Sequence, residues 1–139
     1  MTDPVLPDPQ FSGRCQCGAV RYRLVAPPAW TALCHCDSCR RAAGAPMVAW
    51  MGFEVDQVLW TGTRRFYNSS AKAKRSFCPV CGTQMSFEST AWPGEVHLPA
   101  MSLDDPTAYR PQLHCHAGEQ LDWLKIHDAL PVHQGTAEI

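Results

Sequence analysis

Seven of the eight cysteines in this chain of 139 residues fall into three short motifs. The motifs are Cys15-Gln16-Cys17, Cys34-His35-Cys36-Asp37-Ser38-Cys39 and Cys78-Pro79-Val80-Cys81. Cysteines only one or two residues apart rarely reach disulfide geometry without strain. Their spacing instead suits a soft tetrahedral metal ion such as Zn²⁺, which accepts several thiolates from one tight turn. The motifs therefore predict a domain built around metal-bound thiolates.

The Cys78–Cys81 motif is typical of a zinc knuckle, because two intervening residues let both sulfurs approach one ion at about 2.3 Å. Gly82 permits the turn that aims backbone N–H groups at the thiolates. The alternative, a redox-active pair, requires a thioredoxin-like context that the sequence does not show. A knuckle supplies only two ligands, and the Cys15/Cys17 pair is the expected partner, against the alternative of two core cysteines. We therefore expect a closed zinc site of Cys15, Cys17, Cys78 and Cys81.

The remaining motif offers three thiols, Cys34, Cys36 and Cys39, and predicts a second zinc site with one open coordination position. Structural zinc sites are closed, whereas catalytic sites keep one position for water or substrate. A fourth ligand from the protein would instead make this site structural. The candidates for such a ligand are His35, His114, Cys115 and His116. The sequence leaves open whether the second site is open or closed.

Basic residues follow the second motif directly, at Arg40 and Arg41. A guanidinium beside thiolates offsets their charge and can hold a substrate carboxylate; two solvated surface arginines are the alternative. A second basic run, of Lys72, Lys74 and Arg75, is interpreted as a solvated face, because it is too short to indicate nucleic acid binding.

Composition limits the remaining classes of protein. The net charge is −1, so nothing draws the whole chain toward nucleic acid or an anionic membrane. The longest apolar run, Met47–Phe53, is too short to span a bilayer. The first ten residues lack the features of a secretory signal. We expect a cytoplasmic protein whose thiols stay reduced, with a flexible arm at residues 1–10, one zinc-binding domain at residues 11–131 and a tail at residues 132–139.

The hydrophobic pattern predicts a mostly β fold. Prolines and glycines punctuate the chain at short intervals, and no stretch keeps a helical period over three turns. We expect a mostly antiparallel domain of small sheets with short helical turns. Strands are expected at Val20–Leu24, Trp30–Cys34, Pro46–Phe53, Glu95–Met101 and Leu113–His116, and one helical turn at Ser38–Ala43. Two hairpins are expected, Gln57–Trp60 with Arg64–Asn68 and Lys74–Cys78 with Thr83–Glu88.

Three segments of the chain resemble motifs of the glutathione-dependent formaldehyde-activating enzyme family, which also includes the centromere protein V-like domains. The segments are Gly13–Tyr22, Cys34–Gly44 and Phe77–Thr83, in the family's order and spacing. The resemblance implies a zinc-stabilised β-tent of small antiparallel sheets and two zinc ions. By similarity, Cys15, Cys17, Cys78 and Cys81 would hold the structural zinc, and Cys34, Cys36 and Cys39 the catalytic zinc.

The resemblance also implies an activity, that of a carbon–sulfur lyase joining glutathione and formaldehyde into S-hydroxymethylglutathione. We expect a thiol to bind at the open zinc as thiolate and to attack a small aldehyde. Arg40, Arg41 or a backbone donor would meet the charge on the new alkoxide. The expected partners are thus a small thiol and a small aldehyde, not nucleic acid or membrane.

The alternative function is a zinc-stabilised binding module without turnover. This alternative follows if a protein ligand closes the second zinc site. The chain departs from the family pattern at Leu113–His116, where Cys115 adds an eighth thiol. It also lacks the long basic arm that a chromatin-binding relative would need.

Overall fold

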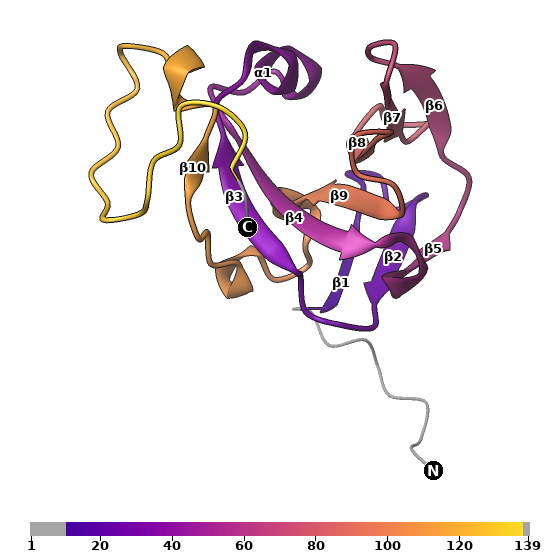
Figure 1. Cartoon of the computed structure of the whole chain (residues 1–139). Coiled ribbons are helices and arrows are strands. Elements are labelled where there is room, and N and C mark those ends of the chain that lie inside the picture. Colours follow the sequence, from indigo (N-terminus) through magenta and orange to yellow (C-terminus); the bar gives the residue numbers. More distant parts are fainter. Residues whose placement is uncertain (1–10, 138–139) are drawn as a thin grey trace.

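The computed structural model describes residues 11–137, so the expected N-terminal arm and the last two residues lie outside the described residues. The strands are β1 (Ser12–Arg14), β2 (Arg21–Leu24), β3 (Trp30–Cys34), β4 (Val48–Glu54), β5 (Val58–Thr61), β6 (Arg65–Asn68), β7 (Ala73–Phe77), β8 (Gln84–Ser89), β9 (Glu95–Pro99) and β10 (His114–Cys115). The helical elements are α1 (Asp37–Ala43) and the 3-10 turns η2 (Val55–Gln57), η3 (Ala100–Ser102), η4 (Pro106–Ala108) and η5 (Ala117–Glu119). The predicted mostly β fold with short helical turns is confirmed (Figure 1).

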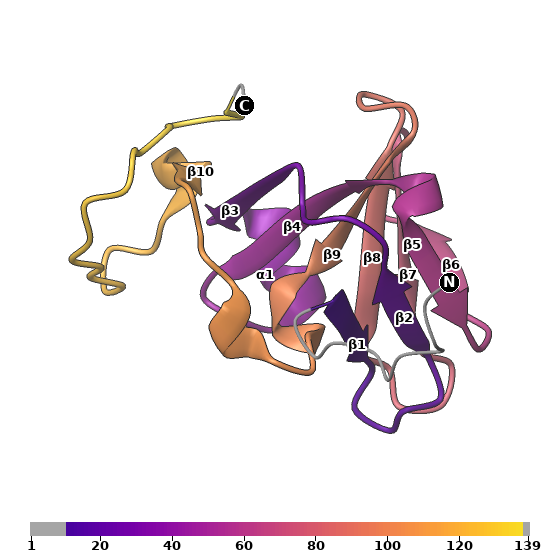
Figure 2. The ribbon, with the colours of Figure 1, turned by 90° about the horizontal axis from the view of Figure 1, so that it is seen from below.

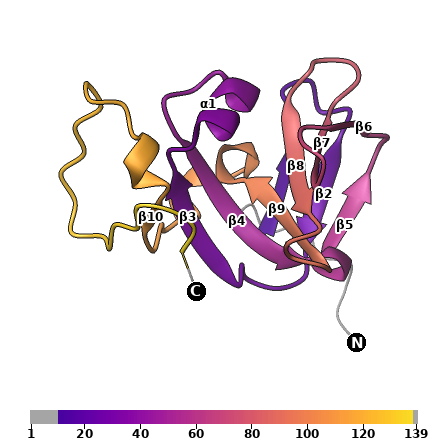
Figure 3. The same ribbon diagram turned by 45° about the horizontal axis from the view of Figure 1, so that its top comes forward.

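Two sheets arise from the strands of residues 11–137. The smaller sheet has the order β1-β2-β5, and the larger has the order β10-β3-β4-β9-β8-β7-β6. Strand pairing is antiparallel in both sheets, except that β10 runs parallel to β3. The smaller sheet lies on one side of the molecule, and the segment that follows β10 lies on the other (Figure 3).

Strand β4 is the most apolar strand because it lies inside the larger sheet, between β3 and β9. Its side chains Val48, Trp50, Met51 and Phe53 are all buried. A strand covered on both faces reads as a continuous apolar run and not as an alternation. The run from Met47 to Phe53 is therefore explained by its central place in the sheet.

One of the two expected hairpins, the one around Thr61–Thr63, is wrong. Strand β5 pairs with β2 in the smaller sheet, whereas β6 pairs with β7 in the larger sheet. Burial explains why β5 and β6 belong to different sheets. Trp60 of β5 packs edge-on against Tyr22 at a ring-centroid distance of 5.6 Å, while every residue of β6 is exposed. Gly62, at φ +89°, lets the chain turn close to the Ala19 carbonyl. The other expected hairpin, β7 with β8, is confirmed.

Strand β1 was absent from the sequence-based prediction. Three residues are too few to show alternation, yet β1 pairs with β2 and places Gly13 opposite Tyr22. The main hydrophobic core lies where the two sheets meet, and it includes Cys15, which follows β1, and Cys78, which follows β7. Two cysteines of different motifs are thus fixed within the same core.

Strand β6 forms an open edge of the larger sheet in the described part of the chain. Its aromatic side chains Phe66 and Tyr67 are each 45% exposed. Two cations cover Phe66, since the Arg64 guanidinium lies 4.9 Å and the Lys74 ammonium 5.1 Å from its ring centroid. This edge therefore combines exposed aromatic surface with positive charge.

The segment after β10 packs along β10 (Figure 2). Val132 forms a parallel bridge with His114, and the His133 N–H donates to the His114 carbonyl at 2.9 Å. Residues at the start of the expected tail are thus hydrogen-bonded to the larger sheet. Among the described residues, no helix is long and apolar enough to cross a membrane.

Candidate metal centres and cavity

The first group of metal-capable side chains is the four-cysteine cluster of Cys15, Cys17, Cys78 and Cys81, whose sulfurs all lie within 4.8 Å of one another. Cys17 Sγ lies 3.6 Å from Cys15 Sγ and 3.7 Å from Cys78 Sγ. The cluster joins the β1–β2 turn to the β7–β8 turn. The structure thus brings together the Cys15/Cys17 and Cys78/Cys81 motifs, which the sequence analysis expected to share one metal ion.

Backbone N–H groups are aimed at the sulfurs of this cluster. The Val20 N–H donates to Cys15 Sγ at 3.3 Å, and the Val80 N–H donates to Cys78 Sγ at 3.4 Å. The expected turn at Gly82 is present, with φ +81° and its N–H donating to the Cys78 carbonyl at 2.8 Å. Donors arranged in this way stabilise the negative charge of thiolates.

The second group is the three-cysteine cluster of Cys34, Cys36 and Cys39, whose sulfurs also lie within 4.8 Å of one another. Cys34 ends β3, Cys36 is the N-cap of α1, and Cys39 lies in its first turn. The Cys36 sulfur accepts the N–H of Cys39 at 3.3 Å, which caps the helix. One short loop therefore positions all three thiols.

The eighth cysteine, Cys115, lies beside this cluster, because the parallel pairing of β10 with β3 places it opposite Cys34. Its sulfur is outside the group that meets the 4.8 Å distance. Interaction with the Cys115 thiol raises the pKa of Cys34, and the same interaction lowers the pKa of Cys115. Cys115 is thus a neighbour of the three-cysteine cluster and a candidate fourth ligand.

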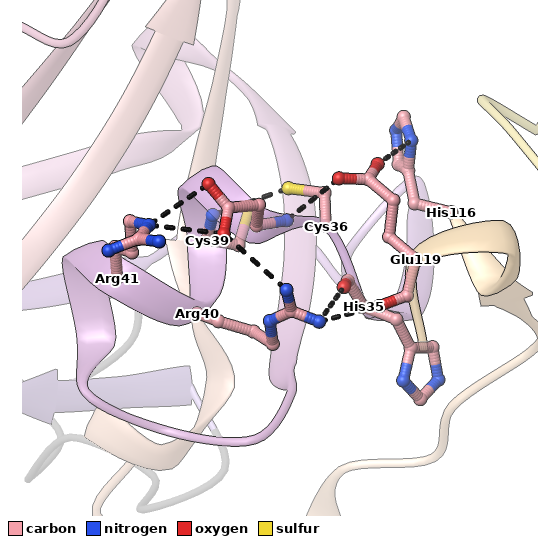
Figure 4. Close-up of polar contacts among 8 residues, drawn as sticks. His35, Cys36, Cys39, Arg40, Arg41, His116 and Glu119 are labelled. Carbon is pink, nitrogen blue, oxygen red and sulfur yellow. Dashed lines mark hydrogen bonds and ion pairs between the residues drawn. The ribbon is translucent and has the colours of Figure 1, made fainter. Parts of the chain in front are cut away.

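The histidine candidates for a fourth ligand have other partners. His35 is fully buried, and its Nε2 lies 2.8 Å from His114 Nδ1. His114 Nε2 in turn lies 2.9 Å from a carboxylate oxygen of Asp128. His116 has its Nδ1 3.6 Å from a Glu119 carboxylate oxygen. His35 points away from the neighbouring cysteines (Figure 4).

Arg40 and Arg41 contact protein groups. Arg40 Nη1 donates to the carbonyls of His35 at 3.3 Å and Glu119 at 2.5 Å. Arg41 forms an ion pair with Asp37 at 3.0 Å, and its side chain is 80% exposed. Figure 4 shows Arg40 directed toward His35 and Glu119. Both guanidinium groups therefore already have oxygen acceptors.

A cavity of about 790 Å³ borders the three-cysteine cluster, and the lining includes Cys34, Cys36, Cys39 and Cys115 but neither Arg40 nor Arg41. The aromatic lining residues are Trp30, Trp50, Phe87, Trp92, His97 and His116. The charged lining residues are Arg75 and Glu95. The cavity thus combines sulfur, aromatic walls and one charge of each sign.

The interpretation of Arg75 as part of a solvated face is wrong, because Arg75 is 1% exposed. Its Nη2 donates to Ser38 Oγ at 3.0 Å and lies 3.8 Å from Cys39 Sγ. The alternation of a strand could have predicted this burial, because Ala73 and Arg75 share one face of β7 and Lys74 points to the other. Lys74 itself is exposed, as expected for the solvated face.

The donor sets of both clusters fit a soft metal ion. Contact with the Cys34 thiol raises the pKa of Cys39, because crowded thiols resist ionising together, and the hydrogen bond from Arg75 lowers it in part. In the four-cysteine cluster, hydrogen bonding with Thr83 lowers the pKa of Cys81 to about 5. Thiolate groups select Zn²⁺ over hard cations such as Mg²⁺ or Ca²⁺, which take oxygen ligands. Both clusters are therefore suited to zinc.

Comparisons with known proteins point to one family. The sequence model of the family described as "Glutathione-dependent formaldehyde-activating enzyme" matches residues 10–119. A Halomonas elongata protein that carries this family name is 29% identical over 126 residues, covering 84% of this chain and 80% of that protein. An uncharacterized lyase of Schizosaccharomyces pombe is 30% identical over 82 residues, covering 59% of this chain and 60% of that protein.

The fold is also found among solved structures. A crystal structure of a Rhodobacter sphaeroides protein matches with a TM-score of 0.54 at 23% identity, covering 66% of this chain and 86% of that one. The match of the family model spans most of the chain and contains both cysteine clusters. The chain belongs to the glutathione-dependent formaldehyde-activating enzyme family.

Proposed function

We propose that this protein is a zinc-dependent carbon–sulfur lyase that adds a thiol such as glutathione to a small aldehyde such as formaldehyde. The observation that carries the proposal is the three-cysteine cluster on the wall of a cavity of about 790 Å³. Three thiols that share a metal leave one tetrahedral position for a ligand. The family and the lyase name of the Schizosaccharomyces pombe relative support the same class of reaction.

In this proposal each cluster holds one zinc ion, and the two ions have different roles. The four-cysteine cluster would hold a structural zinc, because it joins two distant turns of the chain at the main core. The three-cysteine cluster would hold the catalytic zinc, because it lines the cavity. A zinc ion bound there would supply Lewis acidity that favours the thiolate form of a coordinated thiol.

The reaction is an addition across a carbonyl group. The thiol sulfur forms a bond to the aldehyde carbon, the carbonyl π bond breaks, and the thiol proton ends on the oxygen. The protein's own contribution is positioning and exclusion of water. Trp50 and Phe87 line the cavity and lie with ring centroids 6.0 Å apart, so they form an apolar wall beside the cysteines. Reactants held together in such a site react as if at high concentration.

The roles of Arg40 and Arg41 stay predictions. A substrate carboxylate at either residue would have to compete with Asp37 or with the carbonyls of His35 and Glu119. Charge reversal at Arg41 tests the prediction directly, because Arg41 is the more exposed of the two. Weaker glutathione binding by Arg41→Glu would support the predicted role, and unchanged binding would contradict it.

The alternative function is a zinc-stabilised binding module without turnover, and the position of Cys115 favours it. If Cys115 closes the three-cysteine site, a thiol must displace a protein thiolate before it can bind. Cys115→Ser distinguishes the two functions. A closed site predicts that this variant binds glutathione more tightly than the wild type, whereas an open site predicts little change.

The test of the proposed function is binding through sulfur. We expect glutathione to bind the zinc-loaded protein in a calorimeter and S-methylglutathione to bind at least about tenfold more weakly, because it cannot supply a thiolate. Exchange NMR with labelled formaldehyde should then show faster interconversion of S-hydroxymethylglutathione with protein present. Equal affinity for the two peptides would contradict the proposal, and binding without faster exchange would favour the binding module.

A further inference from the structure

The cavity contains one buried cation, Arg75, whose hydrogen-bonding capacity is only partly used. Its Nη1 donates to Gln84 Oε1 at 2.7 Å, and its Nη2 donates to Ser38 Oγ at 3.0 Å. Its Nε is buried and has no hydrogen-bond partner among the described residues. A guanidinium has five N–H donors, so Arg75 keeps donors without a partner among the described residues, with Nε one of them.

The charge of Arg75 is paired with no carboxylate of the described residues, although the Cys39 sulfur lies beside it. A buried cation requires a nearby negative group, because burial removes the water that would otherwise stabilise it. Within residues 11–137, no carboxylate forms an ion pair with Arg75. Glu95 lines the same cavity, but it accepts hydrogen bonds from Trp30 at 3.2 Å and His97 at 3.3 Å. The contact with Cys39 Sγ at 3.8 Å leaves Nε free.

Aromatic rings hold the guanidinium in place. Its central carbon lies 4.9 Å from the Phe87 ring centroid and 6.0 Å from that of Trp50. Both rings line the cavity with Arg75. A cation fixed between rings and neutral acceptors is preorganised for a planar anion, and a carboxylate matches the guanidinium fork.

We propose that Arg75 is the carboxylate-binding residue of the cavity, where its guanidinium holds a carboxylate of the thiol substrate. This inference rests on the proposed function, since it places the thiol sulfur at the three-cysteine cluster. Because Arg75 contacts Cys39, the substrate class is a thiol that carries a carboxylate a few bonds from its sulfur. Arg75 and Ser38 then select this class over neutral thiols.

The test compares two thiols that differ only at the proposed contact, 3-mercaptopropionate and 3-mercaptopropionamide. Affinities are measured by calorimetry on the zinc-loaded full chain, and by the sulfur-to-metal absorption band on the cobalt-loaded chain. The protein variants are Arg75→Gln, Arg75→Lys and the matched control Lys74→Gln, which removes a cation from the opposite face of β7. The decisive quantity is the acid-to-amide affinity ratio of each variant divided by that of the wild type, which cancels differences in thiol acidity.

We expect the acid-to-amide ratio to fall at least about tenfold in Arg75→Gln, to fall less in Arg75→Lys and to stay unchanged in Lys74→Gln. The cobalt band should persist when the amide binds, because the sulfur contact remains. An unchanged ratio in a folded Arg75→Gln overturns the inference and leaves thiol binding intact. If Arg75→Gln does not fold, the test passes to Arg75→Lys. An acid-to-amide ratio in Arg75→Lys equal to that of the wild type then overturns the inference. Absence of binding by both thiols overturns the inference together with the proposed function.

Discussion

The Nε2 atom of His35 lies 2.8 Å from the Nδ1 atom of His114. His114 Nε2 is hydrogen-bonded to Asp128, which has no proton to donate at neutral pH, so His114 carries its proton on Nε2. With both imidazoles neutral, His114 Nδ1 accepts from His35 Nε2, and His35 Nδ1 has neither a proton nor a partner among the described residues. This chain of hydrogen bonds links the loop of the three-cysteine cluster to the segment after β10.

Replacing His114, the middle residue of this chain of hydrogen bonds, tests how much the chain contributes to the stability of the fold. His114→Phe leaves a buried N–H of His35 without an acceptor, and we expect a loss of about 1–3 kcal/mol in the free energy of unfolding. Asp128→Asn should cost less, because the side-chain amide still offers an oxygen acceptor. Urea denaturation at neutral pH gives both values, and the exposed His127→Gln serves as the control. A stability of His114→Phe equal to that of the control would contradict the expectation.

The four-cysteine cluster should matter more for folding than the three-cysteine cluster. Cys17 and Cys78 are 61 residues apart in the chain, whereas Cys34 and Cys39 are 5 residues apart. Zinc binding at a structural site contributes on the order of 10 kcal/mol, which is comparable to the whole stability of a small domain. We therefore expect Cys78→Ser to lose most soluble protein and Cys39→Ser to stay folded with a small change in melting temperature. Greater destabilisation by Cys39→Ser would reverse the assignment of the two clusters.

Metal content gives a separate prediction. Purified protein should contain close to two zinc ions per chain and should release them in two phases during chelation. The three-cysteine cluster should release its ion first, because it lines the cavity and its ligands come from one short loop. Zinc analysis during chelation, repeated on Cys39→Ser, identifies the fast phase. Zinc-supplemented protein that never exceeds one ion per chain would disprove the two-site assignment.

Burial of His97 in the cavity wall should shift the pKa of its imidazole. Burial lowers the pKa of His97, and the hydrogen bond with Glu95 raises it in part. The folded-state pKa is then below the unfolded value of about 6.5, so the unfolded chain binds the proton first as the pH falls. The stability contributed by neutral His97 is full above about pH 6.5 and declines as the pH falls toward the folded-state pKa.

An NMR titration of the His97 ring measures this shift directly. Glu95→Gln removes the partner that raises the pKa, so its midpoint should lie below that of the wild type. Asp122→Asn, an exposed change, is the control and should leave the midpoint in place. A His97 midpoint at or above the ordinary value would contradict the expected direction.

The sequence predicted those features that depend on neighbouring residues. The spacing of the cysteines anticipated both clusters, and short apolar runs anticipated most strands, because both properties are local. The crossing of β5 and β6 into different sheets was not predictable, since it depends on Trp60 meeting Tyr22 from a distant strand.

Long-range contacts also decide the surroundings of the cavity. Burial of Arg75 depends on Ser38 and Gln84, which lie on α1 and β8, and a sequence pattern alone does not show such neighbours. The position of Cys115 beside Cys34 likewise depends on a parallel pairing between β10 and β3. Parallel neighbours are distant in sequence, so local alternation carries no information about them.

Strand β6 is an edge strand, so the addition of a further strand at this end of the larger sheet depends on its exposed side. An open edge with exposed aromatic side chains is a template on which another chain can add a strand. Arg64 and Lys74 lie over Phe66, and Arg65 is exposed in the strand itself. A second copy that approached edge to edge would bring the same cations against them. Electrostatic repulsion, and not a lack of hydrogen-bonding groups, therefore disfavours strand pairing between two copies at this edge.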